Sequence, residues 1–196
     1  WLAQQRRRGV QLAFVIYDTL PLRHPEWFPP GFGALFERWA ELLGRHSDAV
    51  IGISRAVADD YAAWLAERKI TPAPRLTHFH LGADLERSAP TGGLPEDAGE
   101  TLAAIGTAPT ILMVGTVEPR KGHAQALAAF ERLLGDGIEA NLVIVGKPGW
   151  MVEALVARLR NHPERGRRLF WLGGVSDEYL DALYRCATLL LVPAEG

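Results

Sequence analysis

Several features that mark particular classes of protein are scarce or missing in this sequence. Cys186 is its single cysteine, which excludes an internal disulfide, and we expect this thiol to be buried as a small apolar side chain. No apolar run approaches the roughly 20 residues that a membrane-spanning helix needs, and no secretory signal opens the chain. These absences predict a cytoplasmic protein that at most makes peripheral contact with the inner face of a membrane.

A strong charge imbalance is also missing. The formal net charge is -2 and the isoelectric point is about 6.3, so no basic surface predicts a nucleic-acid partner. Hydrophobic residues make up 48% of the 196 residues, which is enough to bury a substantial core in one large domain or two small ones.

What the sequence does contain is an alternation of apolar strands and amphipathic helices. Such an alternation predicts an α/β fold with parallel sheets. A stretch rich in turn residues, residues 86–108, predicts an interdomain connection between a first domain, 1–85, and a second, 109–196. The expected strands are 10–17, 49–53, 76–81, 110–114, 141–145, 168–172 and 188–192, and the expected helices are 32–43, 54–69, 100–105, 123–134, 151–161 and 177–186.

The segment around residues 111–122 is the most informative part of the chain. An apolar strand ends in Gly115 and Thr116, and two cations, Arg120 and Lys121, then precede a helical pattern. Backbone N–H groups and the helix dipole favour an anion at such a place, and the two side chains add full positive charges. The segment therefore predicts a site for a phosphorylated ligand, or else an ordinary strand-to-helix loop with two solvated charges.

Other glycine-bearing segments follow the later strands. Residues 146–150, 173–176 and 193–196 come directly after expected strands, and the first of them carries Lys147. In open parallel sheets ligands bind beyond the carboxyl ends of the strands, so these segments predict one shared crevice. Lys147 is either a second cation for the phosphate or base, or a solvated turn lysine.

At this point the chain resembles the retaining nucleotide-sugar glycosyltransferases of family 4 (group 1), which act in bacterial surface-polysaccharide assembly. Segments of the second half that match the donor domain of that family are 114–123, 142–150, 169–172, 176–180 and the final Glu195-Gly196. Segments of the first half that match its acceptor domain and the crossing between domains are 17–30, 47–55 and 80–84.

The resemblance implies the GT-B architecture, in which two Rossmann-like domains face each other across a cleft. It implies that Arg120 and Lys121 bind the diphosphate of a nucleotide-sugar donor, with Gly115, Thr116 and Lys147 as further donor contacts. Glu195 matches the first glutamate of a paired-glutamate segment and would contact hydroxyls of the donor sugar. Fixed cations can stabilise the leaving diphosphate, so the resemblance implies no metal ion and no cofactor.

The sequence also departs from the family pattern. A histidine that the family often places near Tyr17 or Asp18 is missing, so Asp18 is either its polar substitute or a turn residue, while His24 lies in an expected acceptor-side loop. The glycine-rich loop near the start of the family's first domain is also missing. Both ends predict that the chain is a piece of a longer protein, and we expect it to be poorly soluble or inactive by itself.

These observations lead to one main hypothesis and two alternatives. The main hypothesis is a retaining glycosyltransferase that moves a mannose-type sugar, with GDP-mannose as the expected donor, to a glycan or lipid-linked acceptor. One alternative is a noncatalytic nucleotide-binding module of the same fold, because fold alone does not decide function. The other, a nicotinamide-dependent dehydrogenase, is disfavoured because the Gly-x-Gly-x-x-Gly fingerprint does not follow the strand at residues 111–114.

Overall fold

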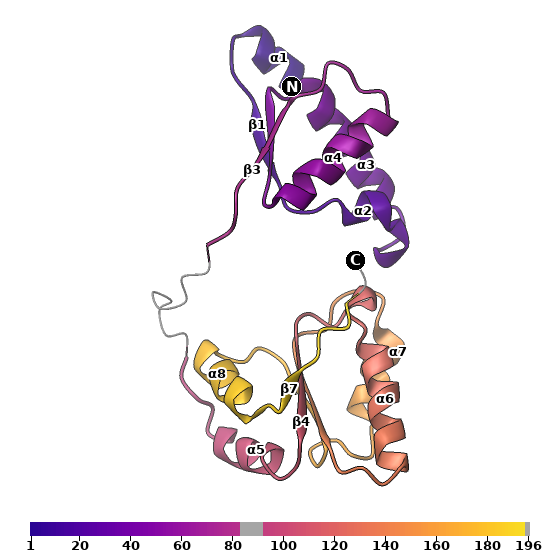
Figure 1. Ribbon diagram of the computed structural model, residues 1–196, viewed down its shortest axis with the longest axis vertical. Helices are drawn as coiled ribbons and strands as arrows, with labels where there is room; N and C mark the ends of the chain where they lie inside the picture. Colours follow the sequence, from indigo (N-terminus) through magenta and orange to yellow (C-terminus); the bar gives the residue numbers. More distant parts are fainter. Residues whose placement is uncertain (83–91, 195–196) are drawn as a thin grey trace. The chain divides into compact units, whose positions relative to one another are not determined.

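The computed structural model describes residues 1–82 and 92–194. The chain divides into two compact units, residues 1–86 and 87–196. Each unit contains its own parallel sheet with helices packed against it (Figure 1). The predicted α/β class with parallel sheets is therefore confirmed.

The first unit has a three-stranded sheet of order β1-β2-β3 in which both neighbouring pairs are parallel. Helices α3 and α4 cover one face of this sheet (Figure 1). The described elements are α1 (Leu2–Arg7), β1 (Ala13–Ile16), α2 (Leu20–Arg23), the 3-10 helix η1 (Pro25–Trp27), α3 (Phe32–His46), β2 (Ala49–Gly52), α4 (Arg55–Glu67) and β3 (Arg75–His78).

The core of the first unit lies between the sheet and its two long helices. Ile16 and Val50 point from the strands toward Tyr61 and Trp64 of α4, and all four side chains are buried. The hydroxyl of Tyr61 donates a 2.7 Å hydrogen bond to the carbonyl of Ala40 in α3. Burial raises the pKa of Tyr61, so this hydroxyl keeps its proton and its bond at neutral pH.

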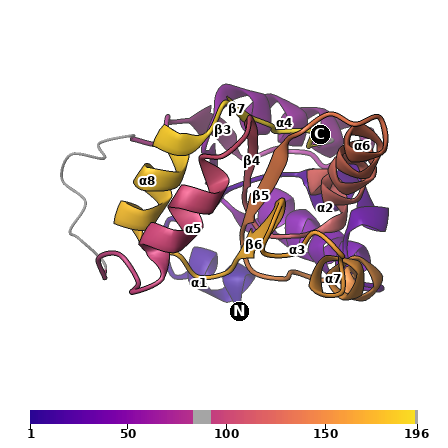
Figure 2. The same cartoon turned by 90° about the horizontal axis from the view of Figure 1, so that it is seen from below.

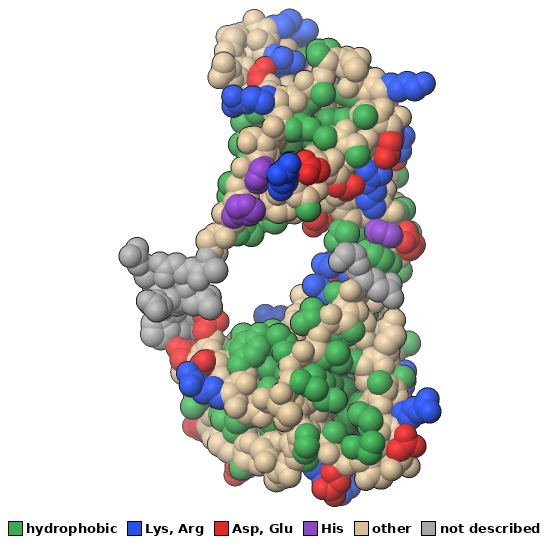
Figure 3. All heavy atoms as spheres, viewed as in Figure 1, with side chains coloured by type: hydrophobic (Ala, Val, Ile, Leu, Met, Phe, Trp, Pro, Cys, Tyr) green, Lys and Arg blue, Asp and Glu red, His purple; other side chains and the backbone are tan. Residues whose placement is uncertain are grey.

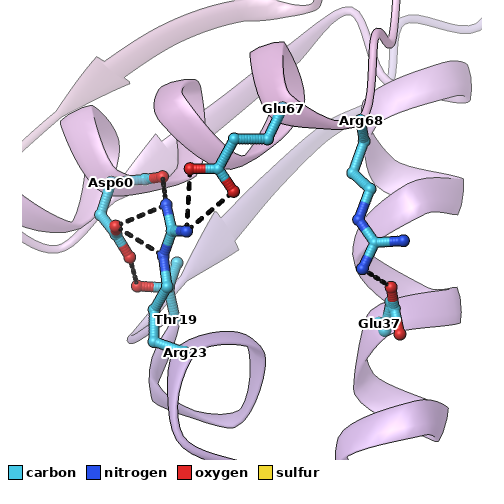
Figure 4. Close-up of polar contacts among 6 residues, drawn as sticks. All are labelled: Thr19, Arg23, Glu37, Asp60, Glu67 and Arg68. Atoms are coloured by element: carbon cyan, nitrogen blue, oxygen red, sulfur yellow. Dashed lines mark hydrogen bonds and ion pairs between the residues drawn. The ribbon is translucent and has the colours of Figure 1, made fainter.

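An ion-pair cluster ties the short helix α2 to α4 (Figure 4). The Arg23 side chain donates to the Asp60 carboxylate at 2.9 Å and to both carboxylate oxygens of Glu67 at 2.9 and 3.0 Å. The Thr19 hydroxyl bonds to the same Asp60. The hydrogen bond to Asp60 is the main cause that raises the pKa of Arg23. The chain that follows β1 is therefore fastened to α4 by groups that satisfy one another.

The second unit has a four-stranded parallel sheet of order β6-β5-β4-β7. Helices α6 and α7 lie on one face and α5 and α8 on the other (Figure 2). The described elements are α5 (Ala98–Ile105), β4 (Thr110–Val114), the 3-10 helix η2 (Pro119–Lys121), α6 (His123–Gly135), β5 (Asn141–Val145), α7 (Glu153–Arg160), β6 (Leu169–Leu172), α8 (Asp177–Cys186) and β7 (Leu189–Leu190).

Side chains of the central strand β5 show how both faces of the second sheet are filled. Leu142 and Ile144 pack toward α6 and α7, whereas Val143 and Val145 pack toward α5 and α8. Successive strand residues point to opposite faces, so an uninterrupted apolar strand fits a sheet that is covered on both sides. This covering explains why all five residues of β5 are buried.

Most predicted elements match the structure within a few residues, and β4 and α8 match at both ends. The last strand is shorter than predicted, because only Leu189 and Leu190 pair with β4 at the sheet edge. The predicted short helix of the connecting stretch, α5, packs in the core of the second unit. The prediction that Cys186 is buried was wrong, since it ends α8 with an exposed side chain.

Apolar side chains are exposed near the last strand. Leu189, Leu190 and Val192 have exposed fractions of 46%, 49% and 69%, and green side chains gather over β7 in Figure 3.

In the described part of the chain, no helix is both long enough and apolar enough to cross a membrane.

Candidate active site at the carboxyl ends of the second sheet

The strand order of the second unit contains a reversal. The chain runs from β4 outward through β5 to β6, and then returns to place β7 on the other side of β4. Parallel sheets of this kind hold their ligands at such a switch point, beyond the carboxyl ends of the two strands where the direction changes. The crevice between the ends of β4 and β7, which we call the switch-point crevice, is therefore the first place to look for a site.

The loops that follow β4 and β5 are fastened to each other beside this crevice. The Val117 N–H donates to the Lys147 carbonyl at 3.0 Å, and the Gly149 N–H donates to the Val117 carbonyl at 2.8 Å. A β-carbon at Gly146 would lie 1.9 Å from the Gly115 carbonyl oxygen, so only glycine permits this approach. The structure thus brings the predicted contacts Gly115, Thr116 and Lys147 together on one rigid pair of loops.

Arg120 has a partner that the sequence analysis did not foresee. It lies in η2, and its guanidinium is 3.0 Å from the carboxylate of Glu118, whose side chain is only 5% exposed. The Arg120 Nε is buried and has no hydrogen-bond partner among the described residues. The charge of Arg120 is therefore shared with a buried carboxylate, which limits the charge that it can offer to a ligand.

Lys121 is the last residue of η2, two residues before α6, and lies next to the switch-point crevice. It has no ion-pair partner within residues 1–82 and 92–194, and it lines a small cavity of about 30 Å³ between the ends of β4 and β7. Gly122 has a positive φ of 69°, and a β-carbon there would meet the Pro193 carbonyl oxygen at 2.6 Å. This glycine therefore lets the loop after β7 lie against the first residue of α6.

His123 is a site residue that the sequence analysis missed. It is the first residue of α6, is only 2% exposed, and lines the same small cavity as Lys121. Neither ring nitrogen has a hydrogen-bond partner among the described residues. Burial, with a smaller effect of Lys121, lowers the pKa of His123 to about 4, so the ring is neutral at pH 7. A histidine directly after Lys121-Gly122, at a predicted helix start, was the available signal.

A larger cavity of about 590 Å³ lies beyond the end of β6. It is lined by the loop at residues 173–176 and by Trp171, Tyr179 and Asp97. The Ser176 hydroxyl donates a 2.5 Å hydrogen bond to the carbonyl of Gly93 at its rim. The Lys147 side chain also reaches this loop, with its Cε 3.5 Å from the place of a β-carbon at Gly174. Lys147 therefore lies between this cavity and the fastened loops.

One predicted site residue lies near the end of the chain. Glu195, the expected contact to the donor sugar, lies outside the described residues, although Pro193 and Ala194 before it line the cavity of Lys121 and His123. In the described ranges, no three His, Cys, Asp or Glu side chains gather as ligands for a metal ion.

The polar residues after β1 in the first unit serve the local structure. An Asp18 carboxylate oxygen accepts a 3.1 Å hydrogen bond from the Leu20 N–H at the start of α2, as a turn residue does. The His24 ring stacks on Trp27 with 3.9 Å between centroids, and its Nδ1 lies 3.1 Å from the Glu26 carboxylate.

Comparison with known proteins identifies the family of the chain. The family model described as glycosyl transferases group 1 matches residues 99–196, which is half of the chain and includes the whole switch-point crevice. The chain belongs to the group 1 glycosyltransferases.

Relatives of this group 1 glycosyltransferase extend the likeness to both units. An Escherichia coli protein named serotype-specific mannosyltransferase WbdA is 47% identical over 195 residues, which are 97% of this chain and 24% of that protein. The chain thus spans about a quarter of the length of this relative. Two further Escherichia coli proteins of the same name are also 47% identical over 195 residues.

Solved structures confirm the predicted GT-B type of fold. Anabaena Alr3699/HepE in complex with UDP-glucose superposes with a TM-score of 0.64 at 17% identity, over 96% of this chain and 48% of that one. Trehalose-6-phosphate synthase OtsA gives a TM-score of 0.62 at 18% identity, over 97% of this chain and 48% of that one. At such low identity these structures establish the fold of this group 1 glycosyltransferase and leave its substrates to be argued separately.

Proposed function

We propose that this chain is part of a retaining glycosyltransferase that moves a mannose-type sugar from a nucleoside diphosphate sugar to a glycan or lipid-linked acceptor. The observation that carries this proposal is the switch-point crevice, where the start of a 13-residue helix meets Lys121, which has no ion-pair partner in the described part of the chain. A helix start favours an anion, and an ammonium group without a carboxylate partner adds a full charge. Both features suit the diphosphate of the donor.

The choice of mannose draws on the relatives rather than on the site. The Escherichia coli proteins that are 47% identical to this chain over 195 residues are named serotype-specific mannosyltransferases. A serotype is a property of surface antigens, so the name supports a role in surface polysaccharide. We take GDP-mannose as the donor to test first.

The nucleoside of the donor has a suitable place beside the crevice. The cavity of about 590 Å³ beyond β6 falls in the range usual for small-molecule sites. The Lys147 side chain reaches this cavity at Gly174, and its backbone belongs to the loops after β4 and β5 that are bonded to each other. We therefore propose that the base and ribose occupy this cavity and that the diphosphate extends from it past Gly115 and Thr116 toward Lys121.

The proposed chemistry depends on where negative charge develops. When the bond between the sugar and the diphosphate breaks, the departing diphosphate gains charge, and fixed cations stabilise it without having to reorganise. Lys121 and the dipole of α6 supply this stabilisation. Arg120 contributes less, because its ion pair with Glu118 offsets part of its charge. The family resemblance adds two expectations, that the leaving phosphate helps to deprotonate the acceptor hydroxyl and that no metal ion is needed.

The test is binding of GDP, GDP-mannose, UDP and UDP-glucose to the complete protein by calorimetry, followed by a sugar-transfer assay. We expect Lys121→Ala to weaken binding of the preferred donor about 10- to 100-fold, which is the effect of losing one hydrogen bond to a charged group. Arg132→Ala is the matched control, because Arg132 is an exposed cation farther along the same helix.

Three outcomes separate the alternatives. Donor binding with transfer supports the enzyme, whereas donor binding without transfer to any glycan acceptor supports a noncatalytic nucleotide-binding module. If the protein is folded but binds no nucleotide sugar, the proposal is wrong. Equal weakening by Lys121→Ala and Arg132→Ala would show that only the general charge of α6 matters.

A further inference from the structure

The buried imidazole of His123 forms no hydrogen bond within the part of the chain that the structure describes. Its side chain is 2% exposed, and both ring nitrogens lack partners among the described residues. A buried polar group is nearly always hydrogen-bonded, because leaving it without a partner forfeits its bonds to water. The histidine at the edge of α7 makes a contrast, since the ring nitrogens of His162 face the Glu164 N–H at 3.1 Å and the Glu131 carboxylate at 3.4 Å.

The surroundings of His123 show which way a partner would come. The small cavity that it lines opens at the switch point, and its other walls are Lys121, the end of β4 and residues 191–194 after β7. Gly122 allows Pro193 to lie directly against the start of α6. His123 and Lys121 therefore lie on the wall of the crevice that the donor would occupy, rather than deep in the core under α6.

The size of the cavity limits what can enter it. About 30 Å³ holds one water-sized group, so a sugar ring or a base does not fit, but a single hydroxyl or phosphate oxygen does. A neutral imidazole carries one N–H donor and one acceptor nitrogen, which suits an oxygen of either kind. Because its pKa lies near 4, the ring offers this N–H without a charge at neutral pH.

We propose that His123 is a ligand-binding residue of the switch-point crevice, where its ring N–H donates a hydrogen bond to one oxygen of the bound sugar nucleotide, next to Lys121. This inference rests on the proposed function, since it takes the nucleoside diphosphate sugar as the ligand. The inference places a neutral hydrogen-bond donor, His123, beside the cation of Lys121. Neither the sequence analysis nor the pattern of ion pairs had assigned His123 a role.

The test compares GDP with GDP-mannose in calorimetry on the complete protein. His123→Phe keeps a ring of similar size but removes both nitrogens, and we expect it to weaken GDP-mannose about 3- to 10-fold, as for the loss of one neutral hydrogen bond. His123→Gln retains an N–H donor and should recover part of the affinity. Phe130→Leu is the control, because this buried core residue of the same helix lies outside the cavity lining.

The two ligands identify the oxygen. Equal weakening of GDP and GDP-mannose assigns it to the phosphates, whereas weakening of GDP-mannose alone assigns it to the sugar. Unchanged binding of both ligands to folded His123→Phe overturns the inference and leaves a histidine that bonds only to buried water. If wild-type protein binds no member of the donor panel, the proposed function fails and this inference fails with it.

A second measurement does not depend on how well the variants fold. In wild-type protein labelled with ¹⁵N in the histidine rings, we expect GDP-mannose to shift the signal of the His123 ring N–H, while the His162 signal stays in place. Saturating GDP-mannose that leaves the His123 signal unmoved would overturn the inference.

Discussion

Arg23, at the end of α2 in the first unit, donates to both Asp60 and Glu67, while Lys121, beside the end of β4 in the second unit, meets no carboxylate among the described residues. Each unit thus has a cation in the segment that follows its first strand in the chain, and the two cations have different surroundings. Around β1 the charges satisfy one another and hold the chain, as they do in Figure 4. Around β4 a cation and a buried imidazole have no polar partner among the described residues.

The same contrast appears in how the two sheets are covered. Helices lie on one face of the first sheet, where Val15 on the other face is 44% exposed, and on both faces of the second sheet. A binding site is more precise when it is built on rigid elements of the scaffold, and a sheet that is packed on both sides is such an element. The second unit is thus the better base for a precise binding site.

The largest expected effect concerns the pH dependence of stability at His123. Its pKa is about 4 in the folded state against 6.5 for an ordinary histidine, so the unfolded chain takes up the proton first as pH falls. The contribution of His123 to the free energy of unfolding is therefore fully present above about pH 6.5. It falls toward pH 4, by up to about 3 kcal/mol. Urea unfolding of wild type and His123→Gln across this range should give curves that converge as pH falls. A constant difference between them would contradict the buried neutral ring.

Next in size is the ion pair between Glu118 and Arg120. Because Glu118 is buried, Arg120→Ala leaves an unpaired carboxylate and should destabilise the second unit by about 2–3 kcal/mol. Adding Glu118→Gln to that variant should restore part of the loss. A double-mutant cycle by chemical unfolding measures the coupling, which we expect at about 1–3 kcal/mol. Strict additivity would mean that the two side chains do not interact, and Arg120 would then be as free as Lys121.

Arg23 tests whether the ion-pair cluster of the first unit serves stability and not binding. Arg23→Ala removes the hydrogen bonds to Asp60 and Glu67 and should destabilise the first unit by about 1–2 kcal/mol. Donor binding should stay unchanged, since this cluster belongs to the first unit. Hydrogen exchange in α4 and calorimetry with GDP-mannose measure the two effects, with the exposed Arg55→Ala as control. A loss of donor affinity would end the proposed division between structural and binding cations.

The smallest effect compares two helix caps. Ser54 accepts a hydrogen bond from the Val57 N–H at the start of α4, and Ser176 accepts one from the Tyr179 N–H at the start of α8. Each serine-to-alanine change should cost about 1 kcal/mol, and Ser176→Ala somewhat more because its hydroxyl also donates to Gly93. Thermal unfolding of the two variants, each with Ser→Thr as control, gives the order. Equal losses would mean that the bond to Gly93 contributes nothing.

Much of the fold could be predicted from local patterns. The apolar run of β4, the helical spacing of α8 and the cap at Ser176 each depend on neighbouring residues, so the sequence alone located them. The exposure of Cys186 could not be predicted in this way, because a residue at the end of an amphipathic helix can face either side. The shortness of β7 depended on its partner strand, which pairs with only two of its residues.

For the site, the sequence by itself determined which chemical groups follow the strands: glycines, Arg120, Lys121 and Lys147 at expected loops and a helix start. Local order in the chain is enough for this, because parallel strands send their carboxyl ends to one edge. Tertiary structure alone decided which of these groups have polar partners among the described residues. Arg120 pairs with the buried Glu118, and Gly122 leaves room for the loop after β7. His123 is buried, with no hydrogen-bond partner among residues 1–82 and 92–194, because segments distant in sequence close around it.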